Sequence, residues 1–210
     1  MYLSKSDIEN SPKRKRINLI NSISGIKPGN LIGTKSNSGQ SNLAIFSSVV
    51  HLGSQPGYFG FFSRPDAEVR RHTYENIKEN GYFTINHIHS DIVEKGHYTS
   101  AKFDAAISEF DACQLTEEYF HDFKAPFVQE SQLKFGLKRV ETIEVKSTNT
   151  IMVVGEIQHL IIADELVDEQ GNIDLGSLNT VGISGLDTYY SLKKIAQFPY
   201  ARVETVPDFG

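Results

Sequence analysis

The chain has 210 residues, of which 39% are hydrophobic and 22% are charged. This length and composition predict one globular domain or a tight pair of domains, and they exclude wholesale disorder and a collagen-like fibre. A disulfide scaffold is also excluded, because Cys113 is the single cysteine. The formal net charge of −5 argues against a protein that binds polyanions over its whole surface, so we expect no nucleic-acid partner.

The apolar runs of the sequence are short. The longest, such as Ile151–Gly155 and Leu160–Ala163, fall far below the ~20 residues that a membrane-spanning helix needs. The first residues lack the apolar core of a secretory signal. We therefore expect a cytoplasmic protein without a membrane partner.

Residues 1–16 are polar and end in four basic residues, Lys13-Arg14-Lys15-Arg16. This segment is expected to be a flexible basic arm, followed by a single domain over residues 17–210. A basic run is also typical of a nuclear or nucleic-acid signal, but a solvated arm explains it more simply.

From residue 17 onward the chain is expected to consist mostly of strands. Strands are predicted over Asn30–Thr34 and Leu43–His51, on either side of a turn at Ser36–Gly39. A short aromatic strand, Tyr58–Phe62, follows the Pro56-Gly57 dipeptide.

One clear helix is predicted from about His72 to Asn80. Thr73 is placed to cap its start, and Gly81 is placed to end it. The alternating pattern of Tyr82–Ile88 then predicts another strand.

The stretch 90–130 is irregular and is expected to hold short helices, for example around Ala105–Ala112. Strands resume at Leu133–Leu137, Val140–Val145 and Ile151–Ile162. Runs of strands with one main helix predict a mainly β fold with added helices, in the form of a closed or nearly closed antiparallel barrel.

Several familiar site motifs are absent from the sequence. There is no G-x-G-x-x-G, no G-x-x-x-x-G-K-[ST] phosphate loop and no C-x-x-C pair. His87 and His89 would share a strand face, as two metal ligands do, but no third ligand is evident and a structural role is favoured. We therefore predict no metal site and no catalytic acid or base.

The basic segment before the predicted helix is the most informative part of the sequence. Arg64 leaves a strand, and Arg71, His72 and Thr73 come at the start of a helix. The free N–H groups of a helix N-terminus, together with two arginines and a hydroxyl, favour a phosphate. The alternative is a solvated basic loop with an ordinary capped helix.

A second segment, Asn42–Ser48, brings small side chains, polar backbone groups and two serines to a strand after a glycine turn. Such a strand can offer N–H and hydroxyl donors to the edge of a flat heterocycle. The alternative is a polar hairpin whose serines bond only to the backbone.

These segments, in their order and spacing, resemble the flavin reductase-like, FMN-binding split-barrel family, which includes flavoredoxins. The resemblance runs from about Asn30 to Tyr190. It rests on Leu31–Thr34, Asn42–Ala44 with Ser47-Ser48, Gln55-Pro56 before Tyr58–Phe62, Arg64 with Arg71–Thr73 and Asn76-Ile77, Tyr82–Asn86, and Val153–Ile157.

The resemblance implies a six-stranded antiparallel split barrel and a homodimer with FMN near the subunit interface. It implies that Arg64, Arg71 and Thr73 hold the phosphate. His72 departs from the Lys-Asp-Thr triplet that is common in the family. The full set of implied cofactor-binding residues is Asn42, Leu43, Ala44, Ser47, Ser48, Ser63, Arg64, Arg71, His72, Thr73, Thr99 and Ser100, the last two approaching from the partner subunit.

The activity that this resemblance implies is hydride transfer from NADH or NADPH to FMN, and from there to an unknown acceptor. Two alternatives remain open at the level of the sequence. One is an FMN-binding electron carrier without nicotinamide turnover, and the other is a binding module for a phosphate ligand that is not a flavin.

Overall fold

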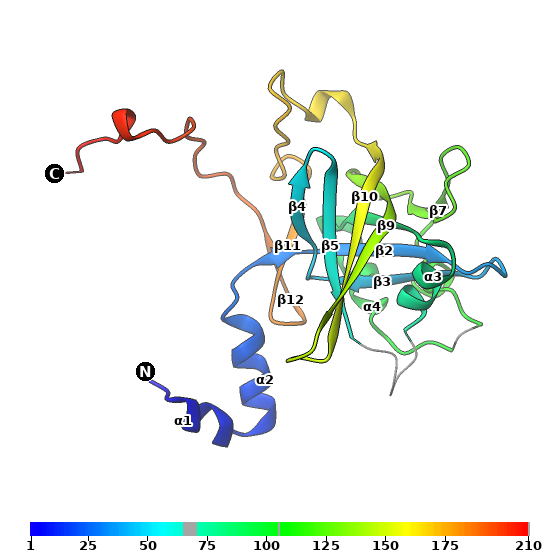
Figure 1. Ribbon diagram of the computed structural model, residues 1–210, viewed down its shortest axis with the longest axis horizontal. Coiled ribbons are helices and arrows are strands. Elements are labelled where there is room, and N and C mark those ends of the chain that lie inside the picture. The colour runs from blue at the N-terminus through cyan, green and yellow to red at the C-terminus, as the bar shows by residue number, and fades with distance from the viewer. Residues whose placement is uncertain (65–70, 105, 210) are drawn as a thin grey trace.

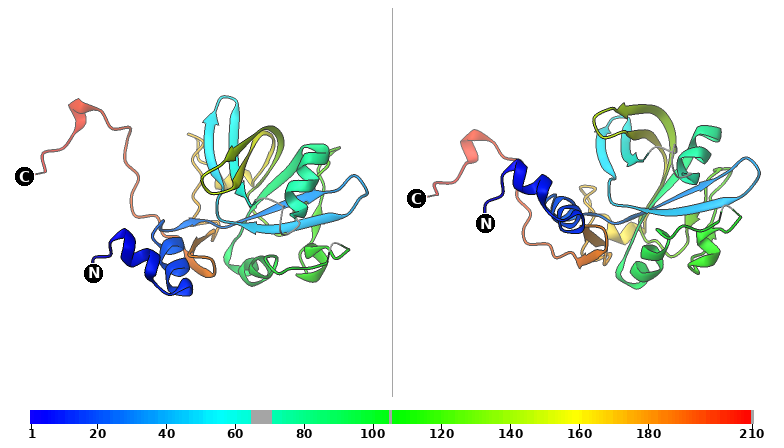
Figure 2. Two further views of the ribbon diagram at one scale, coloured as in Figure 1. Left: turned by 60° about the horizontal axis from the view of Figure 1, so that its bottom comes forward. Right: turned by 90° about the horizontal axis from the view of Figure 1, so that it is seen from below.

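The computed structural model describes residues 1–64, 71–104 and 106–209 (Figure 1). Its main feature is a seven-stranded antiparallel sheet in the order β3-β2-β6-β9-β10-β5-β4. The sheet is curled, as both views in Figure 2 show. Its strands are β2 (Asn30–Lys35), β3 (Ser41–Phe46), β4 (Val50–Ser54), β5 (Gly57–Ser63), β6 (Tyr82–His87), β9 (Lys134–Val145) and β10 (Thr150–Ile161).

A mainly β split barrel with added helices is therefore confirmed, although the sheet has seven strands rather than the expected six. The expected strand Leu43–His51 is in fact two strands, β3 and β4, because the chain leaves one edge of the sheet at residues 47–49 and joins the other edge. The two strands expected over 133–145 are one, β9, which pairs along the whole of β10 with two irregularities in register.

Strand β2 is covered on both faces, and this explains why five of its six residues are buried. Leu31 and Ile32 are adjacent and point to opposite faces, so each enters a different hydrophobic cluster. The first cluster fills the barrel and includes Ile32, Phe61, Phe83 and Leu137. Each such side chain, when fully buried, contributes about 1.5–3 kcal/mol to folding.

Helix α3 (His72–Asn80) packs against β2 and β3, and it adds Tyr74 and Ile77 to the barrel cluster. The expected bounds of this helix are confirmed, and it ends at Gly81, whose φ of 82° favours glycine. The expected cap is wrong. Arg71 is the N-cap residue and its side chain makes no capping bond, and Thr73 lies inside the first turn and faces β3.

The second cluster lies on the other face of β2 and β3. It is formed with two short helices, α4 (Val93–Tyr98) and α5 (Glu109–Ala112), and includes Leu31, Leu43 and Phe110. Short helices in this region were expected. Two small sheets complete the fold: β1 (Lys27–Pro28), β11 (Val181–Ser184) and β12 (Thr188–Ser191) form one, and β7 (Glu117–Glu118) and β8 (Phe127–Val128) form the other.

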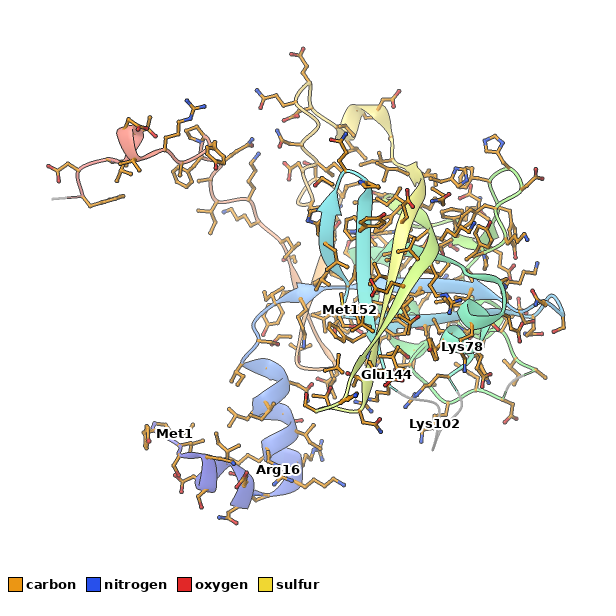
Figure 3. The ribbon with its side chains drawn as sticks, viewed as in Figure 1. Met1, Arg16, Lys78, Lys102, Glu144 and Met152 are labelled. Atoms are coloured by element: carbon orange, nitrogen blue, oxygen red, sulfur yellow. The ribbon has the colours of Figure 1, made fainter. Side chains whose placement is uncertain are left out.

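The N-terminal segment, expected to be a flexible basic arm, forms two helices, α1 over Lys5–Asn10 and α2 over Lys13–Ser22. Neither helix has a buried residue. The helix α2 crosses the expected boundary between residues 16 and 17, so the prediction of strands from residue 17 is wrong at its start. Figures 1 and 3 show both helices and the C-terminal segment standing away from the sheet. In the described ranges, no helix is both long and apolar enough to span a membrane.

Candidate functional site

The start of α3 and the strand β3 meet through buried polar side chains. The Asn42 amide donates to the Thr73 hydroxyl, with 2.9 Å between Nδ2 and Oγ1. Thr34 of β2 accepts from Asn42 at 3.4 Å and from Asn76 at 3.1 Å. The two segments that the sequence singled out are therefore joined directly. A hydroxyl can donate one bond as well as accept, so the Thr73 hydroxyl has the chemistry to bind a ligand oxygen.

The turn between β3 and β4 meets the end of β5. The Ser48 hydroxyl bonds to both backbone groups of Phe62, donating to its carbonyl at 3.2 Å and accepting from its N–H at 3.1 Å. Ser63 follows and is buried, and Arg64 is exposed. Ala44 and Ser47, which precede Ser48 in the chain, are half-buried. The turn that holds Ser47 and Ser48 therefore lies next to the end of β5, which Arg64 follows.

Arg71 carries an unsatisfied donor at the N-terminus of α3. Its Nε is buried and has no hydrogen-bond partner among the described residues. The Arg71 side chain also makes no capping bond to the first N–H groups of the helix. Unpaired buried donors are rare, and this one lies beside the partial positive charge of a helix N-terminus. This combination fits an anion such as a phosphate. Arg70 lies outside the described residues.

A buried carboxylate sits against the outer edge of β3. Glu109, only 7% exposed, accepts a hydrogen bond from the Leu43 N–H, with 2.9 Å between the nitrogen and Oε2. Burial raises the pKa of this carboxyl group, and the bond from Leu43 and the nearby His72 oppose that rise. Leu43 has a fully buried side chain, so it offers a ligand neither its side chain nor its N–H in this structure.

Sequence reasoning missed Glu109. A glutamate in a short helix carries no signal of burial, and its contact with Leu43 joins residues far apart in the chain. Thr34 and Asn76 were noted only as parts of the family pattern. His72 is half-buried at the first position of α3, where its charge acts on Glu109.

Thr99 and Ser100 lie apart from the phosphate segment, at the C-terminal end of α4. The Thr99 hydroxyl donates to Gly96 and the Ser100 hydroxyl donates to His97, both at 2.8 Å to the carbonyl oxygen. Thr99 is buried and Ser100 is exposed. These bonds stay within the end of the helix, so the structure of one chain does not join the two residues to β3 or α3.

The two histidines considered as metal ligands have structural surroundings. Burial lowers the pKa of His87 to about 4, and its ring lies 6.4 Å from that of Phe135 between centroids. The Nε2 of His89 lies 2.9 Å from the Glu130 carbonyl oxygen. Across the described ranges, no three His, Cys, Asp or Glu side chains are arranged to hold a metal ion.

Known proteins resemble this chain in sequence and in fold. A split-barrel protein assigned as a flavin reductase, from Shewanella frigidimarina NCIMB 400, is 47% identical, with a TM-score of 0.92 over 96% of this chain and 100% of that one. Two further structures share the fold. Flavoredoxin of Desulfovibrio vulgaris (Miyazaki F) is 22% identical, with a TM-score of 0.73 over 84% of this chain and 92% of that one. An FMN-binding protein from Thermus thermophilus is 16% identical, with a TM-score of 0.69 over 83% and 90%.

The family comparison covers the whole of the site described above. Residues 26–177 match the model of the flavin reductase like domain. That range holds the seven-stranded sheet, α3, and the junction of β3 with Arg71–Thr73. The chain therefore belongs to the flavin reductase-like family and has its split-barrel fold.

Proposed function

We propose that this protein binds FMN and uses it to pass electrons from NADH or NADPH to a second acceptor. The observation that carries the proposal is the buried Nε of Arg71, which has no hydrogen-bond partner among the described residues and lies at the start of α3. The same helix start is hydrogen-bonded to β3 through Thr73 and Asn42. Membership of the flavin reductase-like family and the FMN-binding protein among its structural relatives support the same cofactor.

The phosphate end of the site is assigned to Arg71, Thr73 and Arg64. Arg71 and Arg64 supply charge-assisted bonds, and the Thr73 hydroxyl supplies a neutral one. His72, at the same helix end, adds positive charge when it is protonated. The α3 N-terminus contributes free N–H groups.

The ring end of the site is assigned to the turn that links β3 to β4. Asn42 and Ala44 of β3 and Ser63 at the end of β5 are assigned to it as well, together with Ser47 and Ser48 of the turn. Asn42 and Ser63 are buried, and the other three are half-buried. Bound FMN supplies the redox chemistry, accepting a hydride and later giving up two electrons. The protein binds and orients it, so no catalytic acid or base is required of the chain.

We further propose a homodimer in which Thr99 and Ser100 of the partner subunit approach the flavin. The strands β3 and β4 are the two edges of the main sheet, and such edges are usually covered. An FMN-binding electron carrier without nicotinamide turnover is the second candidate, because the same site would serve it.

Equilibrium dialysis against FMN, FAD and riboflavin tests the cofactor assignment. We expect clear preference for FMN, since one basic segment with one helix N-terminus suits a single phosphate group. Equal binding of riboflavin and FMN would show that Arg71 and α3 hold no phosphate.

A further inference from the structure

The C-terminal segment, residues 193–209, is rich in apolar side chains that nothing in the chain covers. All of these residues are exposed. Six of them are large hydrophobic residues, between 60% and 97% exposed: Ile195, Phe198, Tyr200, Val203, Val206 and Phe209. A single exposed apolar residue is ordinary, but a run of them marks a segment that binds another surface.

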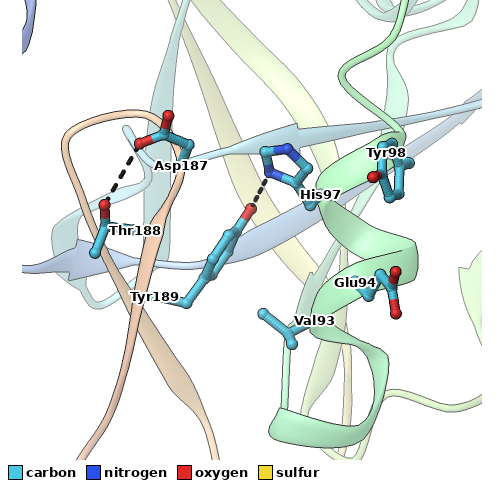
Figure 4. A pocket seen from close by; sticks show the side chains of 7 residues that line it. All are labelled: Val93, Glu94, His97, Tyr98, Asp187, Thr188 and Tyr189. Atoms are coloured by element: carbon cyan, nitrogen blue, oxygen red, sulfur yellow. Dashed lines mark hydrogen bonds between the residues drawn. The ribbon is translucent and has the colours of Figure 1, made fainter.

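The base of this segment is held by β11 and α4. The segment follows β12, and all of β12 is paired with β11. The Oη of Tyr189 in β12 and the Nδ1 of His97 in α4 lie 2.9 Å apart (Figure 4). Their rings meet edge to face, with 5.8 Å between the centroids. The C-terminal segment therefore leaves the body of the molecule from a fixed point.

A groove of about 690 Å³ lies along α2, near the other end of the chain. Its lining consists of Met1, Pro12, Arg14, Lys15, Asn18, Leu19 and Ser22. Four of these residues are spaced i, i+3, i+4 and i+7, starting from Lys15, and so share one face of the helix. The volume is comparable with that of a small-molecule site, so the groove has room for a few side chains of another segment.

The basic residues along this groove lack acidic partners. Helix α2 begins with the basic run Lys13–Arg16 and has no acidic residue in its first turn, although positive charge at a helix N-terminus opposes the macrodipole. Among the described residues, Lys13, Arg14 and Lys15 make no ion pair with a carboxylate. An apolar segment that carries negative charge is therefore the occupant that fits the groove best.

The last part of the C-terminal segment has this composition. Residues 203–209 contain Glu204 and Asp208 and no basic residue. Val203 starts the 3₁₀ turn η3 (Val203–Thr205), and the Val206 N–H donates to its carbonyl. Side chains three residues apart in such a turn lie on the same side. Both valines can therefore enter one groove while Glu204 contacts the basic residues along it.

The groove and the C-terminal segment point away from each other within one chain. Strands β1 and β12 both pair antiparallel with β11, so they run in the same direction. The chain enters β1 from α2 opposite Ile183 and leaves β12 opposite Val181, at the other end of this small sheet. Figures 1 and 3 accordingly show the N-terminal helices and the C-terminal segment standing apart.

From the composition, charge and direction of these segments we propose that residues 203–209 of one copy of the chain bind in the α2 groove of a second copy. In a twofold dimer each copy then gives one segment and receives one. The inference rests on the homodimer proposed above and names one of its contacts. Both segments lie outside residues 26–177, which match the family model, so this contact is additional to any contact between the barrels.

Cross-linking between two coexpressed chains with different tags tests the contact. One chain carries Leu19→Cys and the other carries Val206→Cys, both with Cys113→Ser. Since neither chain holds both cysteines, a short bismaleimide should join the two tagged chains to each other. Ile17→Cys is the matched control for Leu19→Cys. It lies two residues away, on the opposite face of α2 and outside the groove lining, and should cross-link far less.

Hydrogen exchange of α2 gives a second readout that needs no new cysteine. Glu204→Lys with Asp208→Lys reverses the charge of the C-terminal segment and leaves α2 unchanged. We expect amide exchange in residues 13–22 to become about three- to tenfold faster, because an exposed ion pair changes a binding constant by a factor of up to about five. Glu165→Lys with Glu169→Lys makes the same charge change at exposed residues of neither segment and should leave this exchange unchanged.

The outcomes separate this contact from the proposed function. FMN binding and nicotinamide oxidation, measured on the same samples, test the proposed function and do not depend on the cross-link. A dimeric wild type with no cross-link and no faster exchange would overturn the contact and keep the homodimer, whereas a monomeric wild type would overturn both. In a chain that carries both Leu19→Cys and Val206→Cys, a cross-link within one chain in place of one between chains would overturn the second copy as the occupant.

Discussion

Arg71 is the residue on which the phosphate assignment depends most. Replacing it with alanine should weaken FMN binding by roughly 1.5–3 kcal/mol, since a charge-assisted bond is lost, which means a roughly ten- to hundredfold higher Kd. Riboflavin has no phosphate, so its affinity should barely change. Isothermal titration with both flavins measures the difference.

Arg64 provides the comparison for Arg71. It is exposed, so solvent screens its charge and we expect Arg64→Ala to show the same selectivity with a smaller loss. If either variant weakened riboflavin and FMN alike, that arginine would be supporting the fold or the ring rather than the phosphate.

Glu109 makes stability depend on pH. Burial raises the pKa of its carboxyl in the folded chain above the ordinary value of 4.5, so the folded state favours the protonated form. That favourable contribution is complete below the unfolded pKa and is lost as the pH rises through the folded pKa. The free energy of unfolding of the wild type should therefore fall, relative to Glu109→Gln, as the pH rises from about 4 to 8.

Urea denaturation of the two proteins across this pH range measures that difference. Glutamine keeps an oxygen that can accept from the Leu43 N–H, so the comparison isolates the charge. A stability difference that stays constant with pH would mean that Glu109 titrates normally in the folded protein.

Helix α3 is held to the sheet by the polar contacts of Thr73. Thr73→Val removes the hydroxyl that accepts from Asn42 and leaves the buried Asn42 Nδ2 with its 3.4 Å bond to Thr34 among the described residues. We expect a loss of about 1–3 kcal/mol in unfolding free energy together with weaker FMN binding. Thr73→Ser keeps the hydroxyl and should restore most of both.

Two results would contradict this account of the helix. A Thr73→Val protein of unchanged stability would show that the contact between α3 and β3 depends on Tyr74 and Ile77 alone. Unchanged FMN affinity would remove Thr73 from the phosphate site.

The sequence predicted those elements whose signals are local. The bounds of α3 follow from its apolar face and from Gly81, and the β2–β3 hairpin follows from its glycine turn. The break between β3 and β4 was missed because apolar residues continue past Ser47-Ser48, and the crossing from one sheet edge to the other is a tertiary event. The prediction of Thr73 as the helix cap was wrong for the same reason, because its contact with Asn42 is a tertiary one.

The residues of the candidate site also fall into those that the sequence predicted and those that it did not. Arg71, Thr73 and Asn42 were found from residue type and family pattern, and the structure joins the last two directly. The contact of Glu109 with Leu43 could not be predicted, because it joins segments far apart in the sequence that only the folded chain brings together.

At the scale of the whole molecule, apolar side chains of the C-terminal segment lie uncovered. Ile195 is 97% exposed, Phe198 is 84% exposed and Tyr200 is 86% exposed. Such residues, with the open edges of β3 and β4, favour association. Light scattering should give about twice the chain mass of 23.5 kDa. A monodisperse sample at the chain mass would contradict the homodimer.

The central claim is that a bound flavin takes electrons from a nicotinamide nucleotide on this split barrel. The most direct test is the visible spectrum of freshly purified, FMN-supplemented protein, titrated under anaerobic conditions with NADH and, separately, with NADPH. We predict that at least one nucleotide bleaches the flavin absorbance stoichiometrically and that admission of air restores it. A flavin spectrum that neither nucleotide changes, in protein whose flavin dithionite still reduces, would contradict the claim and leave an electron carrier without nicotinamide turnover.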